Sequence, residues 1–360
     1  MSLCGFAFQR PLKNGNIAHF RKGKKRMLLS GRAIAVIAAF LFFAAPALAA
    51  RITPDMEKFI REVSREYGLE PDSVRRLLKK AEIQPAIIRA ITKPAETITW
   101  TRYRTLFMTP ERIGGGVEFW RENAQALELA SKRFGVPPEI IVATIGVETR
   151  YGRNTGNYRV LDALATLGFE FPARGAFFRG ELAQFLLMVD EANLDPMRVT
   201  GSYAGAMGIP QFIPSSFRRW AIDFDEDGKV DFWNSAADAI GSVAYYYYSF
   251  GWGAGAPVVE RAEIFGAAAL PVANAPDKTL AELQEFGISS ESQLDCDTKA
   301  FLVSLDVENG FEHWLGFNNF YVITRYNRSP KYAMAVYQLS QAIREQAAER
   351  ANPSEPRAWE

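Results

Sequence analysis

The sequence predicts an α+β protein that is mainly helical and has a small β-containing region towards its C-terminal end. Three observations carry this prediction. Residues 51 to about 98 and 110 to 250 place apolar residues three and four positions apart, which is the period of an amphipathic helix. Residues 251 to about 326 carry alternating or β-rich runs between Gly, Pro, Asn and Asp clusters. Residues 326–348 return to helical spacing.

The first 49 residues differ in kind from the rest. They contain 8 basic residues and no acidic one. From Met27 they continue with the apolar stretch AIAVIAAFLFFAAPA and the small-residue site ALA, which is the layout of a secretory signal peptide. This stretch is shorter than the roughly 20 residues that a membrane-spanning helix needs, so cleavage is favoured over anchoring. No lipoprotein cysteine follows it, and we expect a soluble exported protein.

Charge and residue types exclude several function classes. The chain has 42 basic and 41 acidic residues, and without the 8 basic residues of the leader it has 34 against 41, a net charge of about −7. This charge gives no support to nucleic-acid binding. His313 is the only histidine outside the leader, which excludes histidine-cluster metal sites, and Cys296 has no partner for an internal disulfide. We therefore expect the chemistry to use carboxylates.

Two helical regions are expected before the β-containing one. The N-terminal helical region covers residues 50–110, with candidate N-cap residues at Thr53 and Asp72. The helical core covers residues 111–250 and is broken at GVPPE, FEFPARG and TGSYAGAMGIPQFIPSS, where Gly and Pro gather.

The β-containing region is expected over residues 251–325. Its candidate strands are APVVERA, AFLVSLDV and NNFYVITRY, which alternate or are rich in β-branched and aromatic residues. A closing helix over residues 326–348 then completes the core, and residues 349–360 are expected to form a loose tail.

The stretch PPEIIVATIGVETRYGRNTG, residues 137–156, places an acidic residue, Glu148, at the end of a long apolar run. The two prolines suit the first turn of a helix, and Gly152 and Gly156 are expected to end it. On that helix Glu148 follows Ile141 by seven positions, so its carboxylate lies on the stripe that faces the core.

A carboxylate on a half-buried face loses hydration when it is ionised, so its pKa rises. A raised pKa is what a general acid working near neutral pH needs. The alternative is a structural carboxylate that is paired with Arg150, Arg153 or Arg174.

A second candidate stretch is GSYAGAMGIPQFIPSSF, residues 201–217, where small residues let the backbone approach a ligand. Within it, Gln211 could offer a hydrogen bond to a sugar and Phe212 a stacking surface. Tight packing without any ligand is the alternative for this loop.

Taken as a pair, GVETRYG and GSYAGAMGIPQFIPSS resemble the lysozyme-like lytic transglycosylases of bacterial cell walls, in particular the membrane-bound lytic transglycosylase B family. The resemblance extends to WTRYRTLFMTPERIGGGVEFW, LDALATLGFEFP, DAIGSVAYYY and YNRSPKYAMAVYQL, and it covers nearly all of residues 53–345. It implies a lysozyme-like catalytic core, peptidoglycan glycan strands as substrate and no organic cofactor. Together with export, it implies the periplasm of a Gram-negative bacterium.

The resemblance assigns roles to individual residues. Glu148 matches the family's single catalytic acid, which protonates the glycosidic oxygen between N-acetylmuramic acid and N-acetylglucosamine. As a base, it then helps the muramoyl C6 hydroxyl to close a 1,6-anhydro ring. The implied sugar groove is lined by Ser202, Met207, Gln211, Tyr246, Tyr326, Asn327, Tyr103 and Arg174. Phe177 stands where a Tyr is expected, so a hydroxyl contact there is not carried over.

Some of these residues also have simpler readings. Tyr246 lies among four consecutive tyrosines and could be a core residue, while Tyr326 and Asn327 could cap the final helix.

Glycosidases normally use two carboxylates about 5 to 9.5 Å apart, and the sequence places no second acid beside Glu148. The nearest downstream candidates are Asp162, Glu170 and Asp190. Without one, the resemblance implies that the substrate's own N-acetyl group stabilises the charge at the anomeric carbon.

A separate motif, DFDEDGKVDFWN at residues 223–234, has the spacing of an EF-hand calcium loop. The expected ligands are Asp223, Asp225, Asp227, the carbonyl of Lys229, Asp231 and Asn234. Asn234 replaces the usual bidentate Glu, so we expect a weak, structural Ca²⁺ site. An acidic turn that holds no ion is the alternative.

The function predicted from the sequence is non-hydrolytic cleavage of peptidoglycan by a monomeric enzyme whose further partners would be wall-synthesis proteins. Two alternatives stay open. A hydrolytic muramidase would use the same acid with a placed water, and a non-catalytic wall-binding protein would keep the aromatic residues and lose the acid. Analysis of the product ends separates the first alternative from the prediction, because hydrolysis leaves free reducing ends.

Overall fold

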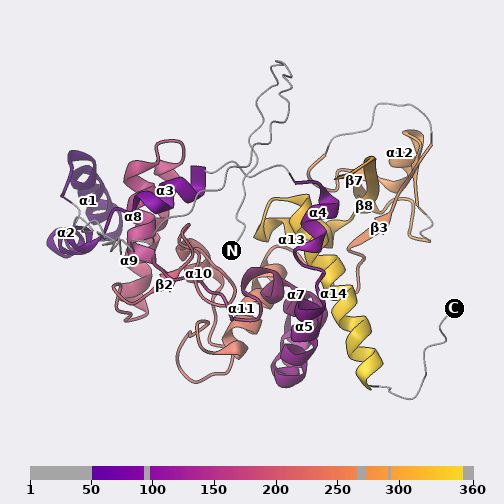
Figure 1. The fold of residues 1–360 in the computed structure, drawn as a ribbon, viewed down its shortest axis with the longest axis horizontal. Helices are drawn as coiled ribbons and strands as arrows, with labels where there is room; N and C mark the ends of the chain where they lie inside the picture. Colours follow the sequence, from indigo (N-terminus) through magenta and orange to yellow (C-terminus); the bar gives the residue numbers. More distant parts are fainter. Residues whose placement is uncertain (1–50, 93–97, 266–272, 291–292, 352–360) are drawn as a thin grey trace, which may run out of the picture.

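The computed structural model describes residues 51–92, 98–265, 273–290 and 293–351. Helices dominate, and small antiparallel sheets are added to them (Figure 1). Helices α1, α2, α8 and α9 lie at one end, α5, α7, α11 and α14 in the middle, and α12 with strands β3, β7 and β8 at the other. This confirms the predicted mainly helical α+β class. The predicted leader, residues 1–49, lies outside the described residues.

The N-terminal helices are α1 (Pro54–Tyr67), α2 (Pro71–Lys80) and α3 (Pro85–Thr92). Thr53 caps α1 as predicted, since its hydroxyl accepts a hydrogen bond from the backbone N–H of Met56 at 3.2 Å. The predicted cap at Asp72 is wrong. Glu70 caps α2 instead and accepts from the backbone N–H of Asp72 at 3.0 Å. The reason is Pro71, whose fixed φ and missing N–H suit the first helical position and start the helix earlier.

Eight helices follow within the described residues up to Ser249. They are α4 (Trp100–Thr105), α5 (Pro110–Glu122), α6 (Ala124–Phe134), α7 (Pro138–Thr149), α8 (Val160–Glu170), α9 (Gly175–Glu191), α10 (Pro214–Trp220) and α11 (Ala236–Ser249). Each of the three predicted breaks covers a junction between two helices of this series and overlaps a helix end by a few residues. Short strands β1 (Tyr158–Arg159) and β2 (Thr200–Gly201) pair antiparallel across the α8–α9 unit.

Helix α7 lies at the centre of the main hydrophobic core. Its residues from Ile140 to Gly146 are all buried, and it packs against α5, α6, α11 and α14. A helix that is apolar on every side is one that its neighbours surround. Residues near the end of such a helix are therefore held firmly, and Glu148 is the last but one residue of α7.

The β-containing region has the strands β3 (Val259–Arg261), β4 (Glu263–Ile264), β5 (Lys278–Thr279), β6 (Ile288–Ser289), β7 (Lys299–Val307) and β8 (Gly310–Gly316), with helix α12 (Leu280–Glu285). The four-stranded sheet has the order β3-β8-β7-β5, with antiparallel pairs throughout. Two of the three predicted strands, APVVERA and AFLVSLDV, are thus found. A second, smaller core forms between α12 and the sheet around Leu283, Ile288 and Leu315.

The third predicted strand is wrong, because NNFYVITRY forms helix α13 (Asn318–Tyr326). Its β-branched and aromatic residues favour a strand, but Asn319 and Ile323, four positions apart, are both buried on one helical face. The side-chain amide of Asn319 also donates to the carbonyls of Gly253 and Ala256, at 2.8 and 2.9 Å. Tertiary packing and these bonds override the local propensity.

The closing helix, α14, runs from Pro330 to Ala351 rather than over residues 326–348. Asn327 is extended and separates α13 from α14, and Pro330 suits the first helical position. At the other end, the Ala- and Glu-rich sequence continues the helix through residues 349–351, which were expected in the tail. Residues 352–360 lie outside the described residues. No helix in the described ranges is long and apolar enough to cross a membrane.

Candidate active site

Helix α7 presents Glu148 at its C-terminal end. Pro137 is the N-cap and Pro138 the first residue of the helix, as predicted. The helix does not end at a glycine, however, because Arg150 takes the left-handed conformation at φ 51° and closes it. Gly156 has a different role. A Cβ there would lie 2.2 Å from the carbonyl oxygen of Gly201, so glycine lets β1 approach β2.

Glu148 is half-buried, and its hydrogen bond comes from a tyrosine. The hydroxyl of Tyr332, at the start of α14, donates to Oε1 of Glu148 at 2.5 Å. Among the described residues, Glu148 forms no ion pair. Of the arginines considered as partners, Arg153 pairs with Glu118 at 3.7 Å, and Arg174 lies over the ring of Phe177 at 4.4 Å. Glu148 is thus not a carboxylate held in an ion pair.

The surroundings of Glu148 alter its proton affinity. Burial disfavours the charged carboxylate and raises the pKa to about 7, although the hydrogen bond from Tyr332 acts in the opposite direction. The residue is therefore close to half protonated near neutral pH. A carboxyl group with such a pKa can donate a proton and can take it back, which is what general acid–base chemistry requires.

None of the three sequence candidates for a second carboxylate assists Glu148. Asp162 is buried on α8, where it is bound by Nε of Arg159 at 2.7 Å and by the backbone N–H of Glu82 at 2.9 Å. Glu170 and Asp190 are exposed. No described acidic residue contributes to the pKa of Glu148. The site accordingly has one acid among its described residues.

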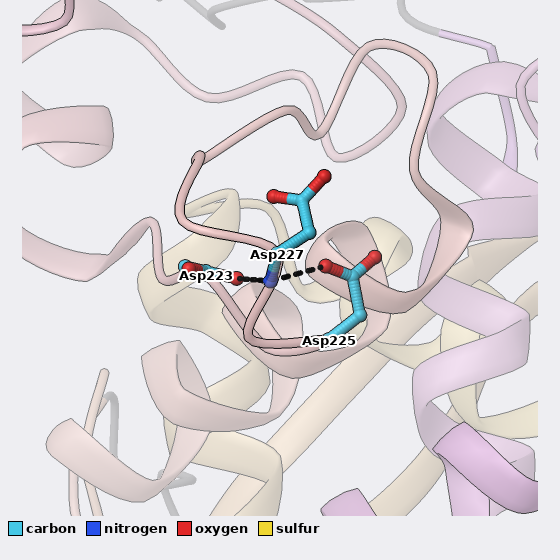
Figure 2. A group of neighbouring side chains, drawn as sticks. All are labelled: Asp223, Asp225 and Asp227. Atoms are coloured by element: carbon cyan, nitrogen blue, oxygen red, sulfur yellow. Dashed lines mark hydrogen bonds between the residues drawn. The ribbon is translucent and has the colours of Figure 1, made fainter.

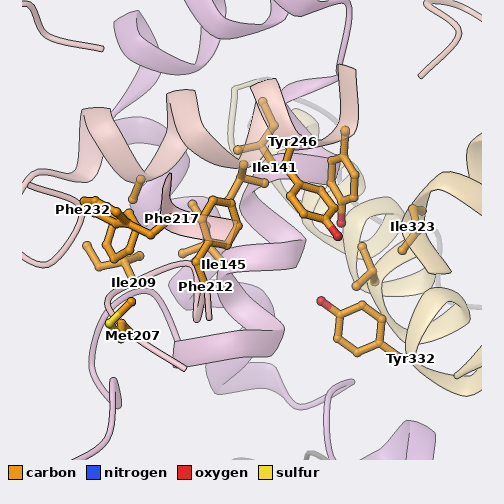
Figure 3. Packing of buried hydrophobic residues seen from close by; sticks show 14 of the residues in the cluster. Ile141, Ile145, Met207, Ile209, Phe212, Phe217, Phe232, Tyr246, Ile323 and Tyr332 are labelled. Carbon is orange, nitrogen blue, oxygen red and sulfur yellow. The ribbon is translucent and has the colours of Figure 1, made fainter. Parts of the chain in front are cut away.

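Four tyrosines surround this acid: Tyr246 and Tyr247 from α11, Tyr326 from α13 and Tyr332 from α14. The rings of Tyr246 and Tyr326 have their centroids 4.9 Å apart, and those of Tyr326 and Tyr332 are stacked at 6.4 Å. Burial raises the pKa of each phenol, and the Glu148 carboxylate raises it further. All four therefore stay protonated and act as hydrogen-bond donors. In Figure 3, the hydroxyl of Tyr332 points towards the side on which Tyr246 lies.

The loop between β2 and α10 lies next to two of these tyrosines, Tyr246 and Tyr326. Met207 is fully buried, and its backbone forms isolated β-bridges to Gly201 and Phe212. Oγ of Ser202 accepts a hydrogen bond from the backbone N–H of Ala206 at 3.1 Å. Gln211 has a left-handed φ of 53°, and its Nε2 donates to the carbonyl of Thr155 at 2.9 Å.

Phe212 is not the stacking surface that the sequence indicated. Only 2% of it is exposed, and its ring packs against Tyr246 and Tyr326 with centroids 5.5 and 5.8 Å away (Figure 3). The ring is buried because its neighbours in the folded chain are themselves aromatic and apolar. Its role is to connect the loop to the tyrosines beside Glu148.

The remaining candidate groove residues fall into two groups. Tyr246 donates to the carbonyl of Arg325 at 2.7 Å, Tyr326 donates to the carbonyl of Pro210 at 2.5 Å, and Oδ1 of Asn327 accepts from the N–H of Ser329 at 3.2 Å. Tyr246 and Tyr326 belong to the surroundings of Glu148, whose charge raises their pKa values, whereas Asn327 forms no hydrogen bond with Glu148. Tyr103 packs on Phe107 in the α4 segment, and Arg174 lies at the start of α9, and neither is a hydrogen-bond partner of Glu148.

Sequence reasoning missed Tyr332. It lies in the stretch SPKYAMAVYQL, three residues into α14, and its ring is 3% exposed, on the same helical face as the buried Val336 and Leu339. A tyrosine on a buried helical face needs a partner for its hydroxyl, which was the available signal. The identity of that partner could not be read from spacing, since Glu148 is 184 positions away.

The acidic loop before α11 forms a second cluster of carboxylates. Oxygen atoms of Asp223, Asp225 and Asp227 all lie within 4.8 Å of one another (Figure 2). Backbone N–H groups hold them: that of Gly228 donates to Asp223 at 2.8 Å and that of Lys229 to Asp227 at 2.9 Å. Three preorganised oxygen ligands fit a hard divalent cation.

The other predicted ligands are arranged differently. Asp231 accepts hydrogen bonds from the side-chain amide of Asn234, the nearer at 2.9 Å, so these two residues contact each other. The sequence did not indicate Asp238, which is buried and accepts from the backbone N–H groups of Phe224 and Asp231, both at 2.7 Å. Its signal was Ser235, which caps α11 three residues earlier. Asp238 fixes the two sides of the loop to the core.

Residues 51–341 match the family model described as transglycosylase SLT domain. The membrane-bound lytic murein transglycosylase B of Escherichia coli is 41% identical over 300 residues, which are 81% of this chain and 82% of that protein. The chain belongs to the transglycosylase SLT family. The resemblance drawn from the motifs is thereby confirmed, and so is the prediction of an enzyme.

Solved structures of this family superpose closely on the chain. Catenated lytic transglycosylase SltB1 from Pseudomonas aeruginosa has a TM-score of 0.79 at 47% identity, with 82% of this chain and 99% of that chain covered. The Escherichia coli lytic transglycosylase Slt35 in complex with calcium has a TM-score of 0.74 at 41% identity, with 82% and 94% covered. SltB3 from P. aeruginosa in complex with NAG-NAM-pentapeptide has a TM-score of 0.71 at 28% identity, with 81% and 80% covered.

Proposed function

We propose that this enzyme is a lytic transglycosylase that cleaves the β-1,4 bond between N-acetylmuramic acid and N-acetylglucosamine in peptidoglycan without water. Its products would carry 1,6-anhydromuramoyl ends. The observation that carries the proposal is a single half-buried carboxylate, Glu148, whose pKa is raised to about 7 by burial and which has no acidic neighbour among the described residues. The names of the relatives and the peptidoglycan fragment bound to SltB3 support the same substrate.

The reaction can be written with one acid–base group. Protonated Glu148 donates its proton to the glycosidic oxygen, and the bond between that oxygen and the anomeric carbon of the muramoyl unit breaks. The muramoyl C6 hydroxyl then forms a bond to the anomeric carbon, and its proton passes to the Glu148 carboxylate. Glu148 is again protonated, and no water has been consumed. The N-acetyl group of the substrate stabilises the positive charge in between.

Tyr332 determines which carboxyl oxygen of Glu148 carries the catalytic proton. Its hydroxyl engages Oε1 of Glu148 at 2.5 Å, so the catalytic proton is carried by Oε2. The backbone of α7 and this one hydrogen bond fix the direction in which the proton is delivered. Tyr332 is thus a positioning residue for the acid.

The sugar contacts are assigned to the residues around Glu148. Ser202, Gln211 and Asn327 offer polar groups, and the loop that holds Gln211 is tied to α13 through Tyr326. Tyr246 and Tyr326 form an aromatic wall, and Met207 is buried within the loop. Tyr103 and Arg174 are proposed to contact parts of the strand farther from the scissile bond, and Phe177 has no hydroxyl to contribute.

The experiment that tests the proposal is mass spectrometry of the products released from purified sacculi. The parent enzyme should release muropeptides with anhydro ends, and Glu148→Gln should release none while still binding sacculi. Asp162→Asn is unsuitable as a control because Asp162 is buried and bonded, so exposed Asp190→Asn serves instead and should match the parent. Free reducing ends in the parent digest would identify a hydrolase and refute the proposal.

We further propose that the loop of residues 223–234 binds a structural Ca²⁺ through Asp223, Asp225 and Asp227, with the carbonyl of Lys229. The convergence of the three carboxylates supports this, as does the calcium complex of Slt35. Asp231 and Asn234 would have to separate from each other to join the ion. Isothermal titration of the metal-free protein with CaCl₂ tests the site, and absence of binding at millimolar Ca²⁺ would refute it.

Export to the periplasm is the corresponding proposal for localisation. It rests on the leader pattern of residues 1–49 and on the substrate, which lies outside the cytoplasmic membrane. The N-terminal sequence of the protein recovered from a periplasmic fraction tests it, with cleavage near Ala50 expected. A chain that begins at Met1 or Met27 and stays in the cytoplasm would contradict it.

A further inference from the structure

Three consecutive glycines, Gly114 to Gly116, lie inside helix α5, where glycine weakens a helix. Packing accounts for two of them. A Cβ on Gly115 would lie 3.1 Å from the ring of Tyr151, and one on Gly116 would lie 2.5 Å from Cδ1 of Ile343. A Cβ on Gly114 would meet no atom nearer than 3.9 Å, so packing leaves this glycine unexplained.

Gly114 belongs to the wall of a cleft between α5 and the C-terminal part of α14. This α5–α14 cleft has a volume of about 680 Å³ and is lined by Gly114 and Trp120 from one helix and by Ala347 and Arg350 from the other. That volume is within the range of small-molecule sites, about 300–1,000 Å³. Trp120 is half-buried and forms an apolar side of the cleft.

Two polar atoms converge over Gly114. Nη2 of Arg350 and Oε1 of Gln346 each lie 3.9 Å from the position that a Cβ would take. Oε1 of Gln346 is buried and Gln346 does not line the cleft, so of these two atoms only Nη2 of Arg350 belongs to a lining residue. Glu118, the acidic residue of the lining, is paired with Arg153 at 3.7 Å. Arg350 has no ion pair within the described chain, so its charge is available to a ligand.

The cleft is separate from the surroundings of Glu148. Tyr332, which contacts Glu148, and Ala347, which lines the cleft, are on the same helix. Their 15-residue separation at 1.5 Å per residue places them about 22 Å apart along α14. A ligand in the cleft therefore does not touch the catalytic acid.

We propose that the α5–α14 cleft binds a sugar that carries a carboxylate, as a muramoyl residue does. The sugar ring lies on Trp120, and the carboxylate binds Arg350. Gly114 leaves room for this ligand to approach the helix backbone. The inference rests on the proposed function, because it adds a second contact to the same glycan strand at a distance from the bond that is cleaved.

The test is a titration of the full chain carrying Glu148→Gln, followed by ligand-observed NMR. The probes are N-acetylmuramic acid and N-acetylglucosamine, which has the same acetamido ring without the carboxylate. Arg350→Gln should weaken binding of N-acetylmuramic acid at least about fivefold and leave N-acetylglucosamine within about twofold, because it removes the partner of the carboxylate. Trp120→Ala should weaken both probes.

Two further variants complete the design. Arg344→Gln removes a charge from the same helix outside the cleft and should change neither titration. Gly114→Ala has room for its methyl group, so it should fold and raise the Tm, yet it should weaken both probes by occupying the floor of the cleft.

The proposal is overturned if Arg350→Gln and Gly114→Ala bind N-acetylmuramic acid as the parent does. It is also overturned if Gln211→Ala alone removes the binding, since the probe would then occupy the catalytic groove. The titration does not depend on cleavage. Failure of the parent enzyme to make anhydro ends would refute the proposed function, whereas unchanged probe affinities would refute the cleft.

Discussion

Glu148 on α7 and the acidic loop before α11 both depend on carboxylates, but their surroundings differ in burial, charge and hydrogen bonding. Glu148 is half-buried, alone, and bonded by a tyrosine that is itself uncharged. Asp225 and Asp227 are exposed, lie within reach of Asp223, and are met by backbone N–H groups and a serine hydroxyl. Isolation in an apolar setting raises the proton affinity of a carboxyl group, while a cluster at the surface provides the oxygen ligands that a divalent cation prefers.

The largest expected effect lies on the Glu148 side of this comparison. Gln keeps the shape of Glu148 and can accept the hydrogen bond from Tyr332, but it cannot donate the catalytic proton. General acid–base assistance is worth about 10²–10⁴-fold, and in the proposed reaction Glu148 serves both proton transfers, so Glu148→Gln should lower kcat at least about 10³-fold. Initial rates of anhydromuropeptide release measure this. Retention of a tenth of the parent rate would mean that another group supplies the proton.

The second effect is on stability, and its sign follows from the raised pKa. Glu148 has a pKa of about 7 in the folded chain against 4.5 in the unfolded chain, so the folded state binds the proton more tightly. The stability it contributes is fully present below about pH 4.5 and is lost as the pH rises through about 7. The loss corresponds to about 3 kcal/mol.

Denaturant unfolding of the parent and of Glu148→Gln measures this loss. Between about pH 4 and about pH 8, the parent should lose about 3 kcal/mol more than the variant. Asp238, whose pKa burial also raises, contributes equally to both proteins and cancels in the difference. If the free energies of unfolding of the parent and of Glu148→Gln change with pH in parallel, then Glu148 is hydrated like a surface carboxylate.

The third effect belongs to the acidic loop. A Ca²⁺ concentration of about 100 times Kd should stabilise the folded chain by about 2.7 kcal/mol, which corresponds to a rise in Tm of about 5 °C or more. Asp225→Asn should remove most of this response, because it removes one charged ligand. Glu226→Gln makes the same change of charge at a neighbouring exposed residue outside the acidic cluster and should keep the response. Equal rises in Tm for both variants would mean that the surface charge attracts Ca²⁺ diffusely and that the loop holds no specific site.

The same comparison explains how much the sequence could predict. Glu148 was recognisable because an acid at the end of an apolar helix conflicts with its surroundings, and the acidic loop because its spacing is local. Both signals lie within about a dozen residues. Tyr332, by contrast, acts on Glu148 from 184 positions away, and only the packing of α14 on α7 brings the two together.

The fold follows the same rule. The cap at Thr53 and strand β7 could be predicted, because a short-range hydrogen bond and a run of β-branched and aromatic residues indicate them. Strand β8, which pairs with β7, was not among the predicted strands. Helix α13 could not, since its strand-like composition is overridden by the contacts of Asn319 with the loop at Gly253 and by the burial of Ile323. Phe212 was misjudged for a related reason, because whether an aromatic side chain faces a groove or the core is decided by distant neighbours.

The smallest expected effect comes from Tyr332→Phe, which removes the hydrogen bond between the Tyr332 hydroxyl and the Glu148 carboxylate. The hydroxyl of Tyr332 stabilises the carboxylate form of Glu148 and so holds its pKa below the value that burial alone would give. Removing it should raise the pKa of Glu148 above about 7, so the alkaline limb of the kcat/KM profile should move to higher pH. A hydrogen bond to a charged group is worth about 1.5–3 kcal/mol, but solvent partly replaces it, and we expect the alkaline limb to move by about one pH unit.

The rate of Tyr332→Phe at low pH should fall about tenfold, because Oε1 of Glu148 is no longer fixed and the proton is delivered in a less constant direction. Tyr246→Phe is the matched control, since that hydroxyl donates to the carbonyl of Arg325 and should leave the limb in place. A profile of Tyr332→Phe that overlays the parent curve would mean that burial alone sets the proton affinity of Glu148.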